Sequence, residues 1–114
     1  MRQAMRRVTL TPLTRWDIEM AQIDHCIVFC YDITRARTRR RVAAALEHLL
    51  NRVQGSVFEG RLKMRAANTL FNRVDSLKDP GDSIRMYVLS RIGFEKSRQS
   101  GGANLPEDTD YWLM

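Results

Sequence analysis

The residues best suited to chemistry lie in one short stretch, CIVFCYDITRARTRRR, at positions 26–41. An apolar segment is followed by one carboxylate, Asp32, and then by five arginines within seven positions: Arg35, Arg37, Arg39, Arg40 and Arg41. This pattern has two interpretations. The arginines could simply neutralise the acid, or acid and arginines could both serve a third group, a metal ion and the phosphates that it bridges.

The simpler interpretation of Asp32 is an acid at the end of a strand that caps the next helix or pairs with an arginine. A functional role needs further ligands, because one carboxylate holds magnesium poorly. Mg²⁺ prefers octahedral oxygen ligands, typically one or two carboxylates with water and substrate phosphate. A twofold dimer would supply a second Asp32 if its axis ran nearby. A metal ion held there would lower the pKa of a bound water and stabilise charge on a phosphodiester. Asp32 is therefore the candidate catalytic residue and Mg²⁺ ligand, from both subunits.

The arginine run has its own two interpretations. A solvated helix face is the simpler one. However, five arginines so close together repel one another, and at the start of a helix they oppose the helix dipole. Phosphates suit a helix N-terminus, and arginine grips them with two parallel hydrogen bonds. We expect some of these arginines to hold a nucleic-acid backbone without reading bases.

The composition is that of one soluble globular domain, with 44% hydrophobic and 28% charged residues in a chain of 114. No apolar run is long enough to span a bilayer and no secretory signal is evident, so we expect a cytoplasmic protein without a membrane partner. Cys26 and Cys30 lie too far apart on one strand for a disulfide and should be reduced. Residues 25–98 carry eight more basic than acidic side chains, which suggests contact with a polyanion.

The hydrophobic pattern predicts a strand at 25–32 buried on both faces, then a helix capped by Thr34. Its apolar stripe is Val42, Leu46, Leu49, Leu50 and Val53. A tight or bulged hairpin is predicted within 53–63, a second helix from Met64 to Leu77, and a strand at 83–90. The turn sequence DPGD at 79–82 ends the second helix.

This order predicts an α+β, ferredoxin-like βαββαβ sandwich over residues 25–98. Both helices would cover one face of the sheet, and an apolar face left bare calls for a second copy, so we expect a homodimer with its sheets face to face. Residues 1–24 form an N-terminal extension with a short predicted helix. Residues 99–114 form a flexible linker and an acidic tail, whose apolar end should contact a partner through Tyr111, Trp112 and Leu113.

Three motifs, YDI at 31–33, RxRVA at 39–43 and RVQGSVFEGRL at 52–62, together resemble the small CRISPR-associated spacer-acquisition subunit. The resemblance covers about residues 25–90 and implies a ferredoxin-like homodimer that bridges CRISPR integrase dimers while holding duplex protospacer DNA. The family's strand-end aspartate falls on Asp32, where some members are described as magnesium-dependent endonucleases. Its arginine element falls on Arg39 and Arg41, the basic residue before its VQ on Arg52, and the aromatic of its SVFE, a site-supporting residue, on Phe58.

The resemblance leaves two tasks open, cleaving nucleic acid or holding it without cleavage. A second class of function is a stand-alone endoribonuclease of toxin type on the same fold, which would act on RNA and need no integrase. An RNA-recognition module is disfavoured, because the expected glycine and aromatic motif of its central strand is absent. Judged from the sequence pattern alone, apart from the resemblance, Phe58 fits a core residue better than a platform on which bases stack. Residues 1–24 have no counterpart in the family.

Overall fold

The computed structural model describes residues 14–15 and 23–102. Within them the chain forms β1 (Asp24–Asp32), α2 (Ala36–Glu47), β2 (Asn51–Gln54), β3 (Val57–Lys63), α3 (Met64–Leu77), β4 (Ser83–Leu89) and α4 (Arg91–Lys96). The predicted N-terminal helix lies almost wholly outside the described residues, as does the tail from 103 onward. In the described part, no helix is both long and apolar enough to cross a membrane.

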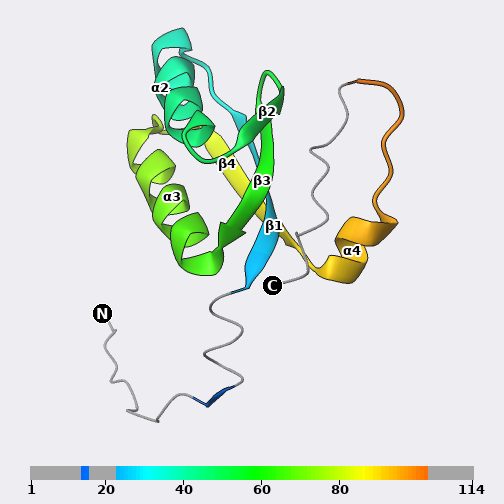
Figure 1. Ribbon diagram of the computed structural model, residues 1–114. Coiled ribbons are helices and arrows are strands. Elements are labelled where there is room, and N and C mark those ends of the chain that lie inside the picture. Colours follow the sequence, from blue (N-terminus) through cyan, green and yellow to red (C-terminus); the bar gives the residue numbers. More distant parts are fainter. Residues whose placement is uncertain (1–13, 16–22, 103–114) are drawn as a thin grey trace.

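The four strands form one antiparallel sheet in the order β2-β3-β1-β4, with β1 paired to β3 on one side and to β4 on the other. Helices α2 and α3 lie side by side on one face of this sheet (Figure 1). This arrangement is the predicted ferredoxin-like α+β fold, which is confirmed. The short α4 contacts β1 and β4 and lies on the opposite side from α2 and α3 (Figure 1).

The core lies between the sheet and the two helices. Side chains alternate along a strand, and in β1 Ile27 and Phe29 are fully buried beneath the helices. They pack with one group of buried residues: Phe58 from β3, Val42 and Leu46 from α2, and Leu70 and Val74 from α3. Alternation therefore turns Val28, Cys30 and Asp32 toward the other side of the sheet, which we call the bare face.

The first helix is shorter than its apolar stripe predicted. It ends at Glu47, and Leu49 and Leu50 lie in the turn that follows, while Val53 belongs to β2. The chain reverses here so that Leu50 packs inward against β3. A Cβ on Gly60 would lie 2.8 Å from Leu50 Cδ2 and 3.4 Å from Leu50 Cα. Leu50 thus reaches the core through a tight turn that packs over Gly60. Its spacing in the sequence nevertheless matches that of a helix, which is why the prediction placed it on the helix.

Thr34 does not cap this helix, contrary to the prediction. The N-cap residue is Arg35, without a side-chain cap, and the Thr34 amide instead donates to Asp82 Oδ1 at 3.2 Å. The hairpin prediction is confirmed, with β2 and β3 joined through Gly55 and Ser56 and a register shift between Arg52 and Gln54.

The sequence reasoning also missed α4. Two local signals mark it: the Ser90 side chain accepts from the Gly93 amide at 3.0 Å, and Arg91 pairs with Glu95 one turn on, also at 3.0 Å. A serine cap followed by a charged pair four residues apart is a recognisable helix start.

Candidate nucleic-acid interface

Asp32 is the last residue of β1, exposed, and opposite Ser83 of β4 in the sheet register. Among the described residues it forms no ion pair and no side-chain hydrogen bond. It does not cap α2 either. Neither of the two structural roles considered for this acid is therefore realised in the described part of the chain.

Arg39 holds the loop that follows Asp32. Its Nη1 donates to the Ile33 carbonyl at 3.1 Å and to the Thr34 carbonyl at 2.7 Å. The Arg39 guanidinium thus satisfies two backbone acceptors that no helix or strand uses. This gives Arg39 a structural role that the sequence did not reveal, while its role in nucleic-acid binding stays a prediction.

The loop between α3 and β4 also contacts the segment that joins the end of β1 to the start of α2. Thr38 Oγ1 donates to Asp79 Oδ2 at 2.7 Å, and Asp82 accepts through both oxygens, from the Thr34 amide and from the Asp79 amide at 3.0 Å. Gly81 has φ +91°, a left-handed conformation that glycine adopts without strain and that closes this turn. Asp79 and Asp82 are therefore positioning residues for the start of α2.

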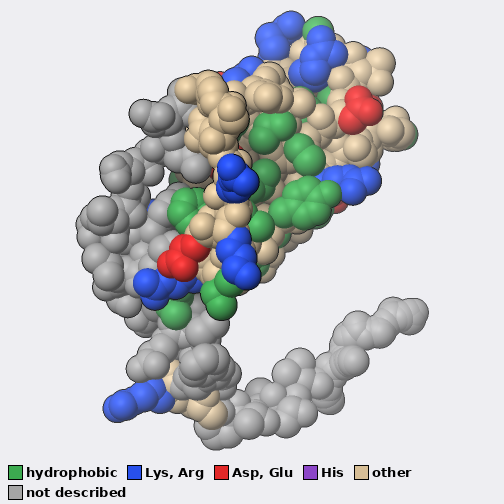
Figure 2. Space-filling view, turned by 90° about the vertical axis from the view of Figure 1, so that its right-hand side faces the viewer, with side chains coloured by type: hydrophobic (Ala, Val, Ile, Leu, Met, Phe, Trp, Pro, Cys, Tyr) green, Lys and Arg blue, Asp and Glu red, His purple; other side chains and the backbone are tan. Residues whose placement is uncertain are grey.

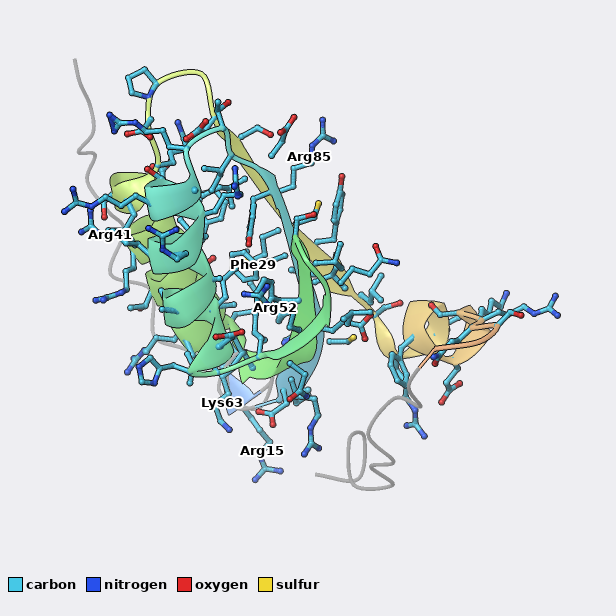
Figure 3. All side chains as sticks on the ribbon, turned by 90° about the horizontal axis from the view of Figure 1, so that it is seen from above. Arg15, Phe29, Arg41, Arg52, Lys63 and Arg85 are labelled. Atoms are coloured by element: carbon cyan, nitrogen blue, oxygen red, sulfur yellow. The ribbon has the colours of Figure 1, made fainter. Side chains whose placement is uncertain are left out.

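Three arginines form the outer face of α2. Arg37, Arg40 and Arg41 are spaced three and four residues apart, which places them on one side of a helix, and all are exposed. None of them has a hydrogen bond or ion pair within the described residues, and no acid lies in the first turn. Arg35 adds a fourth, 68% exposed, with only a 3.7 Å contact to Asp79. Arg41 points outward, away from the sheet (Figure 3).

Arg52 is held by its own chain. Its Nε lies 3.1 Å from Glu47 Oε2 and its guanidinium lies 5.0 Å above the Phe58 ring. Phe58 is fully buried and stacks on Tyr31, whose hydroxyl donates to the Gly55 carbonyl. Burial raises the pKa of Tyr31, and the nearby Arg52 opposes that shift. Phe58 is thus part of the core, covered by Arg52, and does not offer a face to a nucleic-acid base.

Asp32 and the α2 arginines do not face the same way. By strand alternation Asp32 belongs to the bare face, whereas α2 covers the opposite side. Arg85 of β4 lies on the side of Asp32, opposite Cys30 in the register, and its Nη1 donates to Tyr87 Oη at 3.0 Å. Figure 3 shows Arg85 on the side of the sheet away from α2. The sequence analysis missed Arg85, although the alternation within 83–89 places it on the face of Asp32.

The bare face is apolar at its centre. Figure 2 looks onto the side opposite α2 and α3, and hydrophobic side chains gather in the middle of it with basic ones around them. The register places Val28, Cys30, Val57, Tyr87 and Leu89 on this face, and on β3 it adds Glu59 opposite Val28 and Arg61 opposite Cys26. Tyr87 is 47% exposed even though it sits in mid-strand. This is the surface for which the sequence predicted a second copy.

One chain supplies little for a metal ion. Among the described residues, no group of three or more His, Cys, Asp or Glu side chains could hold one. Asp79 and Asp82 already accept hydrogen bonds, which leaves Asp32 as the free carboxylate at this junction. One carboxylate, completed by water, phosphate and a second copy's carboxylate, fits the oxygen chemistry of Mg²⁺.

These features define a small ferredoxin-like domain with an exposed acid at the end of its central strand and a basic helix beside it. The family described as "CRISPR associated protein Cas2" matches residues 25–97. The chain belongs to this family, as its motifs had indicated.

Similar proteins agree with this assignment. A curated protein of Synechocystis sp., named CRISPR-associated endoribonuclease Cas2 2, is 33% identical over 87 residues, which are 75% of this chain and 94% of the relative. The crystal structure of Streptococcus pyogenes Cas2 has a TM-score of 0.58 at 26% identity, covering 67% of this chain and 99% of that one. A chain of a partial Cas6-RT-Cas1–Cas2 complex has a TM-score of 0.59 at 26% identity, covering 74% and 96%.

Proposed function

We propose that this protein is a CRISPR adaptation subunit that binds the backbone of duplex protospacer DNA and bridges integrase dimers during spacer acquisition. The observation that carries the proposal is the outer face of α2, where Arg37, Arg40 and Arg41 are exposed and have no partner among the described residues. Such a face costs electrostatic free energy unless an anion lies against it.

The proposal divides the predicted nucleic-acid contacts into two groups. Arg35, Arg37, Arg40 and Arg41 contact phosphates directly. Arg39 and Arg52 act mainly within the protein, since Arg39 fastens the loop after Asp32 and Arg52 is engaged by Glu47 and Phe58. Phosphate contacts of this kind fix the position of a duplex and carry no sequence information.

A homodimer completes the proposed subunit. The apolar centre of the bare face is covered by the same face of a second copy, through a twofold axis. The likeness to a chain of a Cas1-containing complex supports assembly with an integrase, as does the family itself. A contact of the acidic tail with a subunit or partner, through Tyr111, Trp112 and Leu113, stays a prediction from the sequence.

Binding is tested by fluorescence anisotropy of a labelled duplex over a range of salt concentrations. The triple variant Arg37→Ala, Arg40→Ala, Arg41→Ala should bind more weakly, and its plot of log affinity against log salt should be shallower by about 2 to 3, because each phosphate contact contributes about 0.9 to the slope. Arg91→Ala, which also removes an exposed arginine but from α4, is the control and should leave the slope unchanged. An unchanged slope in the triple variant returns these arginines to the solvated-face interpretation.

A second candidate activity is cleavage of RNA or DNA, and it is favoured by the name endoribonuclease carried by the curated relative. Asp32 from each subunit would hold Mg²⁺, and a magnesium ion bound there would supply an activated water and charge stabilisation at a phosphodiester. Labelled duplex DNA and single-stranded RNA are incubated with wild type and Asp32→Ala, with magnesium or chelator. Magnesium-dependent cleavage that disappears in Asp32→Ala with binding intact makes this protein a nuclease, whereas binding without cleavage in both makes it a scaffold.

A further inference from the structure

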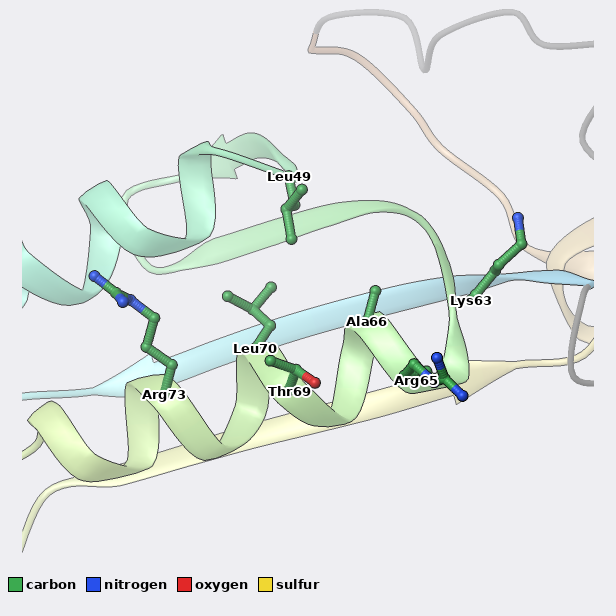
Figure 4. Close-up of a pocket in the computed structure, with 7 residues that line it drawn as sticks. All are labelled: Leu49, Lys63, Arg65, Ala66, Thr69, Leu70 and Arg73. Carbon is green, nitrogen blue, oxygen red and sulfur yellow. The ribbon is translucent and has the colours of Figure 1, made fainter.

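A hollow of about 370 Å³ lies between the end of α2 and α3, away from the surfaces used above. Its apolar part consists of Leu49, Ala66 and Leu70, and three cations stand around it: Lys63, Arg65 and Arg73. Leu49, in the turn after α2, points across the hollow toward Leu70 on α3 (Figure 4). A volume of this size is within the range of about 300–1,000 Å³ that ligand sites occupy.

The hollow is open and electropositive. Leu49 is 50% exposed, which is unusual for a leucine beside a buried one such as Leu70. Arg65 and Arg73 are exposed and have no hydrogen bond or ion pair from their side chains within the described residues, whereas Lys63 pairs with Asp24 at 3.1 Å. The first turn of α3 contains no acid, so the positive end of its dipole is also uncompensated. These features select a ligand that is both apolar and acidic.

We propose that the C-terminal tail of the chain, residues 105–114, docks in this hollow. Its sequence, LPEDTDYWLM, carries three acids and no base, followed by Tyr111, Trp112, Leu113 and Met114. The acids complement Arg65 and Arg73, and an aromatic side chain covers Leu49 and Leu70. An aromatic residue buries roughly 150–250 Å² when it leaves water, which makes Trp112 the best anchor.

The connection is long enough. α4 ends at Lys96, sixteen residues before Trp112, and an extended chain spans about 3.3 Å per residue, or roughly 50 Å in all. A domain of this size has a radius of gyration of about 12 Å, so the tail can pass around its own domain. Gly101 and Gly102 have φ +76° and +78°, left-handed conformations that glycine adopts without strain and that turn the chain at this point. The inference is independent of DNA binding, because the α2 arginines take no part in it.

Trp112 fluorescence in the full-length chain tests the docking. Trp16 is replaced by phenylalanine, which leaves Trp112 as the single tryptophan, since the chain has two. Docking should shift the emission to shorter wavelength and lower the acrylamide quenching constant at least about twofold relative to a free peptide of residues 103–114, because the indole is covered. In the same background, Arg65→Glu with Arg73→Glu, and separately Leu49→Asp, should restore quenching to the level of the free peptide.

Two further variants decide the outcome. Arg37→Glu with Arg40→Glu makes the same change of charge on α2 and should leave Trp112 protected. Asp108→Lys with Asp110→Lys, combined with Arg65→Glu and Arg73→Glu, should recover the protection through a charge swap. The proposal is overturned if Trp112 in the protein with an unmodified hollow is quenched as strongly as in the free peptide. It is also overturned if Trp112 stays protected when Leu49, or Arg65 and Arg73, are replaced. Protection lost on dilution would place the tail of another copy in the hollow and overturn docking within the chain.

Discussion

Thr38 Oγ1 donates a 2.7 Å hydrogen bond to Asp79 Oδ2, 41 residues further along the chain, and so fastens the first turn of α2 to the loop between α3 and β4. Thr38 is only 6% exposed. The adjacent ion pair between Arg35 and Asp79 is longer, at 3.7 Å, and Arg35 is 68% exposed, so it contributes about 0–1 kcal/mol. The hydrogen bond, more than the ion pair, therefore fixes where the arginine face of α2 begins.

Replacing Thr38 by valine tests this conclusion, because valine keeps the shape and removes the hydroxyl. We expect the free energy of unfolding to fall by about 1–2 kcal/mol, since the part-buried Asp79 carboxylate loses a donor. Urea denaturation measures the change. Thr69→Val, at an exposed site on α3, is the matched control and should change stability by less than about 0.5 kcal/mol. Equal stabilities for Thr38→Val and wild type would show that the bond contributes nothing.

Arg39 and Arg41 should separate stability from DNA binding. Arg39→Ala removes two hydrogen bonds to backbone carbonyls and should lower the free energy of unfolding by about 1.5–3 kcal/mol. Arg41→Ala should be nearly neutral for stability but should weaken duplex binding severalfold at low salt. Denaturation and anisotropy are measured on both proteins. If Arg39→Ala is as stable as wild type and loses affinity as Arg41→Ala does, Arg39 belongs with the phosphate contacts.

The fold was predictable because its signals are local and strong. The apolar run at 26–31 and the helical spacing from Met64 to Leu77 both produced elements close to those predicted. The errors came from contacts between distant residues. Thr34 has the chemistry of a cap, yet Asp82 binds its amide, and Leu50 fits the stripe of α2, yet it reaches the core through a turn against Gly60.

The candidate site was predictable in composition but not in geometry. A run of arginines indicates a basic surface, yet the sequence cannot tell that Arg39 points back to Ile33 and Thr34 while Arg41 points outward. That distinction depends on which side of α2 meets the loop after β1. Likewise, alternation within β4 groups Arg85 with Tyr87 and Leu89 on one face of the strand. The register of β4 against β1 is needed to show that this face is the one of Asp32 and that Arg85 lies opposite Cys30.

The two cysteines should react at very different rates with a thiol reagent. Cys26 is 3% exposed, and burial, followed by the charge of Glu59, raises its pKa to about 11. The thiolate is the reactive form, so Cys26 should react slowly near pH 8 and about tenfold faster per pH unit until the pH approaches that pKa. In protein diluted until it is monomeric, Cys30, which is only partly buried within one chain, should be alkylated first, as peptide mass spectrometry at successive times would show. Modification of Cys26 before Cys30 would contradict the burial.

Tyr87 tests the proposed homodimer. It is 47% exposed on the bare face, opposite Val28 in the register, and a twofold contact through this face would bury it. Tyr87→Glu should raise the dimer dissociation constant at least about tenfold, because burying a carboxylate among apolar side chains costs free energy even with Arg85 beside it. Light scattering gives the mass, and circular dichroism confirms that the variant is folded.

Ala44→Glu is the control for this variant, since Ala44 is exposed on α2, on the other side of the sheet. It introduces the same charge and should leave a dimer, while it weakens DNA binding through the neighbouring arginines. A dimeric Tyr87→Glu protein would place the twofold contact elsewhere. In that case the two Asp32 carboxylates would not meet across this face. A shared magnesium site would then be lost, because the described part of one chain offers only Asp32 as a free carboxylate at the end of β1.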